Sequence, residues 1–142
     1  MKNIRKCSES DYSDLVDIWE RSVRSSHDFL SQADIAEIRS KLVAEYLPNV
    51  DLSCIEADGR ITGFIGIANA KIEMLFIDSV FQGQGYGSML MDYAINQGAM
   101  SVDVNEQNPK ALEFYKSKGF HITGRDDTDD AGRPFPILHL SL

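Results

Sequence analysis

The chain has 142 residues, 43% of them apolar and 25% charged, and its formal net charge at pH 7 is −8. These values are typical of one folded domain, so residues 1–142 are treated as a single domain. The acidic balance argues against nucleic acid as the main partner, because duplex binding needs a basic surface, and no stretch approaches the ~18 uninterrupted apolar residues of a membrane span. The basic start lacks the apolar run of a secretory signal, and Cys7 and Cys54 show no metal spacing. We therefore expect a cytoplasmic protein with reduced thiols, no membrane association and no metal.

The first half of the chain predicts one strand, two helices and a hairpin. Residues 3–7 form a short strand, and Ser8 is the expected N-cap of the helix that follows. Apolar residues at helical spacing continue that helix and predict a second one, which Pro48 ends. Two apolar runs, residues 52–57 and 61–69, flank an Asp-Gly turn, and this arrangement is typical of a β-hairpin.

The second half of the chain alternates strands with helices around a glycine-rich loop. The predicted order of the whole chain is β-α-α-β-β-β-α-β-α-β-β, an α/β fold with a mixed sheet and helices on its faces. The strands expected here cover residues 71–78, 101–105, 120–125 and 135–142, and the helices cover residues 87–98 and 109–119.

The glycine-rich loop "QGQGYG" contains three glycines in six residues, Gln82 to Gly87. It lies between a strand and a helix, so free amides of the first helical turn point into it and favour an anion. Glycines let such an anion approach the main chain closely. The loop fits neither a Walker sequence, because Ser88 and Met89 follow Gly87, nor the dinucleotide pattern G-x-G-x-x-G. A glycine-rich turn without a ligand is the alternative.

A different pattern fits the loop. Gln-x-x-Gly-x-Gly, here Gln82, Gly85 and Gly87, resembles the pyrophosphate loop of the GCN5-related N-acetyltransferases (GNATs). "LFIDSVF" before it is similar to the family's strand end, with Ser79 where proline is common. "NEQNPKALEFYKSKGF" resembles the family's Asn-x-x-Ala-x-x-Phe-Tyr-x-x-x-Gly-Phe pattern, and other stretches resemble small bacterial members. The resemblance covers essentially the whole chain and implies the GNAT fold.

The resemblance also implies a cosubstrate, acetyl-CoA. In the family, loop amides hold the pyrophosphate of coenzyme A, and the strand before the loop pairs with the pantetheine arm where two parallel strands splay apart. An amide near Leu75 is the implied oxyanion donor. Asn105 and Asn108 are candidate side-chain contacts, although turn and cap chemistry also explains them. The implied cofactor-binding residues are Leu75, Phe76, Ile77, Gln82, Gly83, Gln84, Gly85, Tyr86, Gly87, Ser88, Asn105, Asn108 and Tyr115.

Three residues are candidates for catalysis. Tyr115 corresponds to the family's tyrosine near the thioester sulfur, as a hydrogen-bond donor able to act as an acid; a core aromatic is the alternative. Glu73 lies on the strand before the loop, but an ordinary carboxylate is about six pKa units less basic than a primary amine. We favour a water relay, or Glu73 as a binding group for the cationic acceptor. His27 starts closer in pKa and is a second candidate base, with capping or packing as its alternative. His121 and His139 are interpreted as structural.

These observations favour an acetyl-CoA-dependent N-acetyltransferase that acts on a primary amine of a small molecule or of a protein, by direct attack in a ternary complex. A non-catalytic acyl-CoA-binding or sensor domain is the alternative, and the acidic balance counts against an RNA-directed toxin. The first two helices and residues 125–135 are expected to build the acceptor pocket, where a run of aspartates recruits a cation or forms a solvated turn. Which amine enters, and whether the chain is a monomer or homodimer, stays open.

Overall fold

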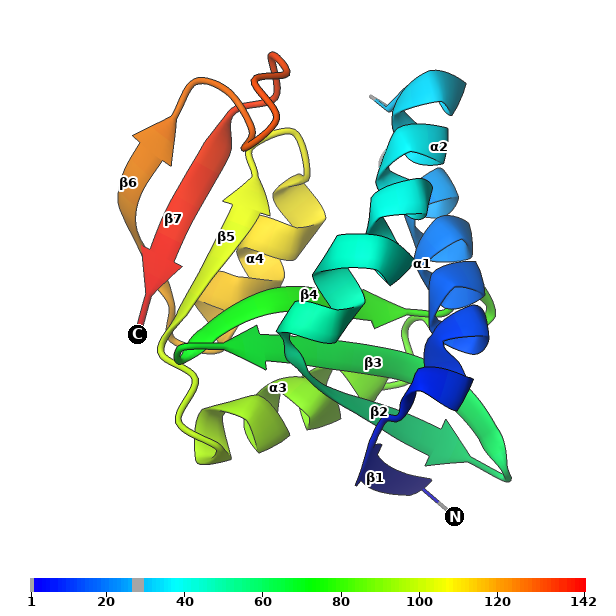
Figure 1. Cartoon of the computed structure of the whole chain (residues 1–142). Coiled ribbons are helices and arrows are strands. Elements are labelled where there is room, and N and C mark those ends of the chain that lie inside the picture. The colour runs from blue at the N-terminus through cyan, green and yellow to red at the C-terminus, as the bar shows by residue number, and fades with distance from the viewer. Residues whose placement is uncertain (1, 27–29) are drawn as a thin grey trace.

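The computed structural model describes residues 2–26 and 30–142, and it is built around one seven-stranded sheet in the order β1-β2-β3-β4-β5-β7-β6 (Figure 1). Neighbouring strands are antiparallel except β4 and β5, which are parallel. The strands are β1 (Lys2–Lys6), β2 (Asp51–Ala57), β3 (Arg60–Ala68), β4 (Lys71–Ile77), β5 (Ser101–Asn105), β6 (His121–Asp126) and β7 (Ile137–Ser141).

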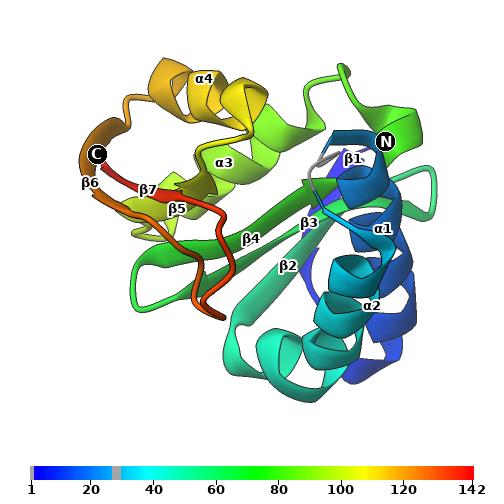
Figure 2. The same cartoon turned by 90° about the horizontal axis from the view of Figure 1, so that it is seen from above.

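Helices cover both faces of the sheet. Figure 2 shows α1 and α2 on one face and α3 and α4 on the other. Their bounds are α1 (Tyr12–Ser26), α2 (Gln32–Lys41), α3 (Tyr86–Asn96) and α4 (Pro109–Ser117). The predicted order of strands and helices, and with it the α/β fold with a mixed sheet, is therefore confirmed. None of the helices in the described parts of the chain is long and apolar enough to cross a membrane.

Each face of the sheet has its own core. On the α1 side, the apolar stripe predicted for the first helix is buried, and Leu15, Ile18 and Trp19 pack with Phe64 of β3. On the other side, side chains of α3, α4 and the inner strands form a second cluster that includes Tyr115. The helical spacing read from the sequence thus marks the faces that remove apolar surface from water.

Several boundaries differ by one or two residues from the sequence-based expectation, and two differences involve a proline. The α-helical part of the second helix ends at Lys41, and a π-helical turn (Leu42–Tyr46) and a 3₁₀ turn (Leu47–Asn49) continue the helical path past Pro48. Pro48 is tolerated because it lies in the first turn of the 3₁₀ helix, where no amide donor is needed. The last strand begins at Ile137 rather than at residue 135. The Phe135 amide donates to Arg133 in a turn, and Pro136 has no amide to donate to a neighbouring strand.

Two tight hairpins join β2, β3 and β4. The predicted Asp-Gly turn has positive φ at both Asp58 and Gly59, as a two-residue hairpin of this twist requires. The second turn, Asn69–Ala70, adopts the same conformation with φ of 52° and 63°. The carbonyl of Ala70 accepts from the amides of Met100 and Ser101 and so fixes where β5 starts beside β4.

Replacing Ala70 with glycine is expected to stabilise the protein by about 0.5–1 kcal/mol. An alanine in the left-handed region costs about 1–2 kcal/mol, and glycine removes that cost while adding some unfolded-state entropy. Urea unfolding at an unchanged m-value measures the difference. Ala68, two residues earlier at the end of β3 and without a positive φ, is the matched control, because glycine there should destabilise. Equal effects at both positions would contradict the argument.

Candidate functional site

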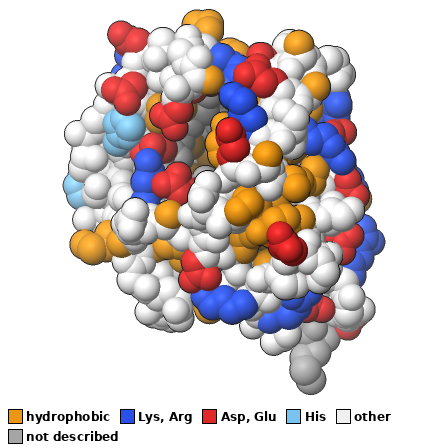
Figure 3. All heavy atoms as spheres, in the orientation of Figure 1, with side chains coloured by type: hydrophobic (Ala, Val, Ile, Leu, Met, Phe, Trp, Pro, Cys, Tyr) orange, Lys and Arg blue, Asp and Glu red, His pale blue; other side chains and the backbone are white. Residues whose placement is uncertain are grey.

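The parallel strands β4 and β5 part soon after they begin. Their described residues pair at Lys71 with Ser101 and at Ile72 with Val102, and beyond these positions the strands diverge (Figure 1). A pocket of about 180 Å³ opens between them. Figure 3 shows a hollow between β5 and α2, with acidic and basic side chains gathered at its rim. The splayed strands leave main-chain groups of β4 without a partner strand, and these groups can bind an extended ligand.

A β-bulge turns β4 at the pocket. Gly66 of β3 pairs with Met74 and Ile67 pairs with Ile72, so the register passes over Glu73. Ile72 and Met74 are two residues apart, yet they pack in the clusters on opposite faces of the sheet. Glu73 is exposed, lines the pocket and makes no hydrogen bond or ion pair with the residues that the structure describes. The bulge therefore presents an unpaired carboxylate at the pocket.

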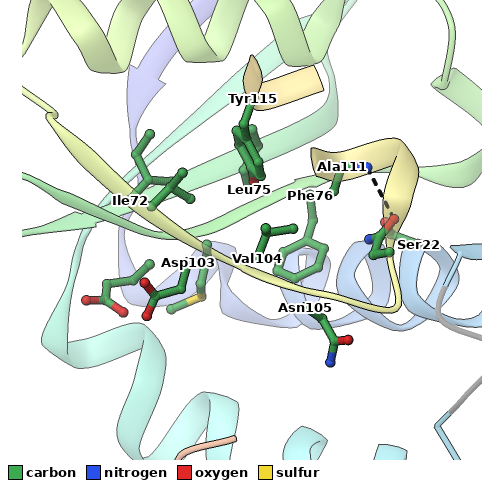
Figure 4. Close-up of a pocket in the computed structure, with 13 residues that line it drawn as sticks. Ser22, Ile72, Leu75, Phe76, Asp103, Val104, Asn105, Ala111 and Tyr115 are labelled. Atoms are coloured by element: carbon green, nitrogen blue, oxygen red, sulfur yellow. Dashed lines mark hydrogen bonds between the residues drawn. The ribbon is translucent and has the colours of Figure 1, made fainter. Parts of the chain in front are cut away.

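Tyr115 closes the apolar end of the same pocket. It points from α4 into the space between the strands (Figure 4), and its side chain is packed edge-on between Phe114 and Phe120. Only 8% of the residue is exposed. Burial raises the pKa of Tyr115 to about 12, because the charged phenolate is poorly solvated there. The hydroxyl thus keeps its proton at any physiological pH and can act as a hydrogen-bond donor.

Asn105 and Asn108 also line the pocket, from the end of β5 and the start of α4. Asn108 is the N-cap of α4, and its side-chain oxygen accepts from the amide of Ala111 at 3.3 Å. Asn105 accepts from the amide of Gln107 at 2.8 Å. Both asparagines therefore have the turn and cap roles that the sequence left as an alternative. Both also line the pocket, and their predicted contact with the cofactor stays a prediction.

One charged cluster at the pocket was missed by sequence reasoning. Asp103 lines the pocket from β5 and bonds Lys71 Nζ at 2.7 Å and His139 Nδ1 at 2.6 Å. The other ring nitrogen of His139 lies 2.8 Å from Asp126. Asp103 and then Asp126 raise the pKa of His139 above its ordinary value. The partners of His139 come from two neighbouring strands, and strand pairing alone brings these positions together. The interpretation of His139 as structural stays a prediction.

The glycine-rich loop follows β4 after a short 3₁₀ turn (Ser79–Phe81). Gly83 and Gly85 have φ of 79° and 88°, a conformation that side chains with a Cβ rarely adopt, and the described residues leave open space in front of both. Gly85 is also the residue before α3, so the unbonded amides of the first helical turn lie at the loop. The conformation and the open space suit a bound diphosphate.

A buried ion pair holds the beginning of this loop. Asp78, which follows β4, is fully buried, and its two carboxylate oxygens each accept from the Arg21 guanidinium of α1 at 2.9 Å. Arg60 lies 3.7 Å away, and the Asp78 amide donates to the carbonyl of Thr62 at 2.8 Å. Burial pushes the pKa of Asp78 upward, but the bonds and charge of Arg21 outweigh it and hold the pKa below its ordinary value.

The structure brings six of the predicted site residues into one pocket, and the other predicted residues that the structure describes lie in the adjoining strand end and loop. Those in the pocket are Glu73, Leu75, Phe76, Asn105, Asn108 and Tyr115. Ile77 ends β4, and Gln82–Ser88 form the loop and the first turn of α3. His27 lies outside the described residues. Ser22 of α1 and Asp103 line the pocket and were not predicted. In the described ranges, no three His, Cys, Asp or Glu side chains are grouped as metal ligands.

Comparison with known proteins identifies the class. The family model described as the acetyltransferase (GNAT) domain matches residues 20–136. The chain belongs to the GNAT family and is an acetyl-CoA-dependent N-acetyltransferase, so the enzyme interpretation is confirmed over the sensor domain.

Particular relatives are similar over their full lengths. The chain is 41% identical to the peptidyl-lysine N-acetyltransferase YjaB of Salmonella typhimurium, across 99% of this chain and 97% of that protein. The solution structure of apo-form YjaB from Escherichia coli matches with a TM-score of 0.90 at 36% identity, over 99% of this chain and 97% of the other. The PaiA N-acetyltransferase of Thermoplasma acidophilum, crystallised with coenzyme A, shares the fold with a TM-score of 0.73 at 21% identity, covering 100% and 99% of the two chains.

Proposed function

We propose that this enzyme transfers the acetyl group of acetyl-CoA to the side-chain amine of a lysine in a protein or peptide. One observation carries the proposal: the buried hydroxyl-bearing ring of Tyr115 and the unpaired carboxylate of Glu73 line the same pocket between the splayed strands. A lysine side chain is a long cation, and the carboxylate of Glu73 in the pocket lining has the opposite charge. The name of the Salmonella relative, a peptidyl-lysine acetyltransferase, supports the same acceptor class.

The cosubstrate side of the proposed site consists of β4, the glycine-rich loop and α4. Acetyl-CoA supplies the acetyl group as a thioester. Main-chain groups of Leu75 to Ile77 are available to an extended arm because β5 has diverged from β4. Amides of Gln82–Ser88 bind the pyrophosphate, and Tyr115 donates a hydrogen bond on the sulfur side. Holding the two reactants together in this way can supply roughly 7–11 kcal/mol of the barrier.

The acceptor side depends on Glu73. Asp103 is already bonded to Lys71 and His139, whereas Glu73 is unpaired among the described residues. Glu73 therefore holds the acceptor ammonium through opposite charge. An ordinary carboxylate is about six pKa units too weak to remove the ammonium proton efficiently. The proton therefore passes through water molecules to the bulk solvent before the neutral amine attacks the thioester. His27 stays a second candidate base.

The acceptor class is tested with one peptide in two forms and with a free amine. The purified protein is incubated with acetyl-CoA and a peptide that has a blocked N-terminus and one lysine, and release of free thiol and the acetylated residue are measured. The same peptide with methionine in place of lysine, and free lysine as a small amine, are the comparisons. Acetylation of the lysine peptide alone supports the proposal. Acetylation of the small amine but not of the peptide would reject a peptide acceptor.

Replacing Glu73 with glutamine is expected to raise the KM for the lysine peptide about tenfold, with the KM for acetyl-CoA unchanged. A charge-assisted hydrogen bond contributes about 1.5–3 kcal/mol, and the exposed position of Glu73 places its effect at the low end. Initial rates at varied peptide concentration measure the change. Glu113→Gln on the exposed side of α4 is the matched control. An unchanged peptide KM would remove Glu73 from acceptor binding.

A further inference from the structure

The first turn of α3 receives its positive charge from another helix. The residues of that turn, Tyr86 to Met89, carry no charged side chain. Lys118, at the C-terminal end of α4, reaches across to it, and its ammonium group bonds the hydroxyl of Ser88. The cation thus lies directly after the glycine-rich loop, beside the free amides of the helix start.

Lys118 is held there by a carboxylate of α3. Its ammonium lies 2.9 Å from Asp92, one helical turn beyond Ser88. The Lys118 side chain is only 19% exposed, whereas that of Asp92 is 63% exposed. The lysine is therefore confined between the two helices, and the aspartate can turn away into water. This arrangement keeps the ammonium close to the loop at a small cost in side-chain entropy when an anion arrives.

The overall charge of the chain gives the Lys118 cation particular weight, although the Lys2 ammonium also lies near this turn, 5.0 Å from the centre of the Tyr86 ring. The chain has a formal charge of −8, and coenzyme A carries several negative phosphate oxygens, so the general field of the protein opposes binding. Helix amides supply only part of the compensation. A lysine ammonium is a common partner of phosphate in such loops.

We propose that Lys118 is a ligand of the cosubstrate's pyrophosphate, which adds a side-chain cation to the loop amides. On binding, the ammonium exchanges its bonds to Ser88 and Asp92 for a phosphate oxygen, and the exposed Asp92 turns away into water. The inference rests on the proposed acetyl-CoA site.

Affinity measurements on single variants test the inference. Isothermal titration with acetyl-CoA is expected to show about tenfold weaker binding for Lys118→Gln, in line with the loss of one charge-assisted hydrogen bond. Lys116→Gln removes an equal charge from an exposed position of the same helix and should change the affinity less than twofold. If Lys118→Gln binds as tightly as the parent, the inference is wrong.

Asp92→Asn separates a binding role from a merely structural one. Both Lys118→Gln and Asp92→Asn break the link between α3 and α4, so a structural role predicts that both weaken acetyl-CoA binding. A phosphate-binding role predicts opposite signs, because Asp92→Asn removes a competing negative charge and should leave binding equal or tighter. Thermal unfolding of both variants verifies that they are folded.

A second cosubstrate shows whether Lys118 contacts the pyrophosphate or the 3′-phosphate of coenzyme A. Acetyl-3′-dephospho-CoA keeps the pyrophosphate and lacks the 3′-phosphate. Lys118→Gln should weaken both cosubstrates equally; a loss confined to acetyl-CoA would assign Lys118 to the 3′-phosphate and overturn the inference. If the parent protein binds neither compound, the proposed function fails, whereas binding by the parent without an effect of Lys118→Gln rejects only this inference.

Discussion

Replacing Tyr115 with phenylalanine is expected to lower kcat about 10²- to 10³-fold and to leave the KM for acetyl-CoA nearly unchanged. The magnitude is that of removing one preorganised hydrogen-bond donor from an active site. The ring packs between Phe114 and Phe120, so phenylalanine fills the same space and the fold is preserved. The substitution removes a single hydroxyl group from the pocket.

The raised pKa of Tyr115 limits what that hydroxyl can do. With its pKa at about 12, the phenol is about 3.5 units less acidic than an ordinary thiol near 8.5, so full transfer of its proton to a thiolate is uphill by about 5 kcal/mol. Tyr115 is therefore expected to donate a hydrogen bond rather than its proton. The pH–rate profile of the parent should show no loss from tyrosinate below about pH 11. A kcat within threefold of the parent for Tyr115→Phe would remove this residue from the mechanism.

Replacing Asp78 with asparagine is expected to destabilise the protein by about 2–3 kcal/mol. Removing one partner of a buried ion pair leaves the other partner and the remaining hydrogen bonds uncompensated. The expected loss is smaller than the roughly 3–5 kcal/mol typical of a fully buried pair. The reason is that the Arg21 side chain is 46% exposed and can turn to water. Chemical unfolding near neutral pH measures the difference. Asp51→Asn, which breaks an exposed pair with Lys6, is the control and should cost less than about 1 kcal/mol.

The pH dependence of this loss gives a second check. Asp78 has a depressed pKa in the folded protein, so its contribution to stability is present above the unfolded pKa near 4 and disappears as the pH falls through the lower folded value. The difference between the parent and Asp78→Asn should therefore be constant above about pH 5 and shrink in acid. A difference that grows on acidification would contradict the ion-pair explanation.

The elements of this fold could be predicted from local patterns because each depends on neighbouring residues. The stripe of Leu15, Ile18 and Trp19 predicts the buried face of α1, and Asp58–Gly59 predicts a two-residue hairpin; both are found. The glycine-rich loop was placed correctly between a strand and a helix, since Gly83 and Gly85 indicate a backbone conformation rather than a distant contact.

The charged half of the site could not be predicted in the same way. Asp103, Lys71 and His139 come from three strands, and their contacts follow from register. An alternating strand pattern shows which residues share a face, but not which residue of another strand lies opposite. The pairing of Asp78 with Arg21 likewise joins positions 57 residues apart, without any local signal.

The bulge at Glu73 places a residue in β4 that the packing of the sheet does not use but that lines the proposed site. If this residue is left out, Ile72, Met74, Leu75 and Phe76 alternate between the two cores without interruption. The sheet would thus keep its hydrophobic pattern with one residue fewer, and the hairpin to β3 would need no irregularity. Glu73 is an insertion that packing does not require. In a redesign of this scaffold, deleting Glu73 would retain the architecture and remove both the bulge and its carboxylate from the pocket.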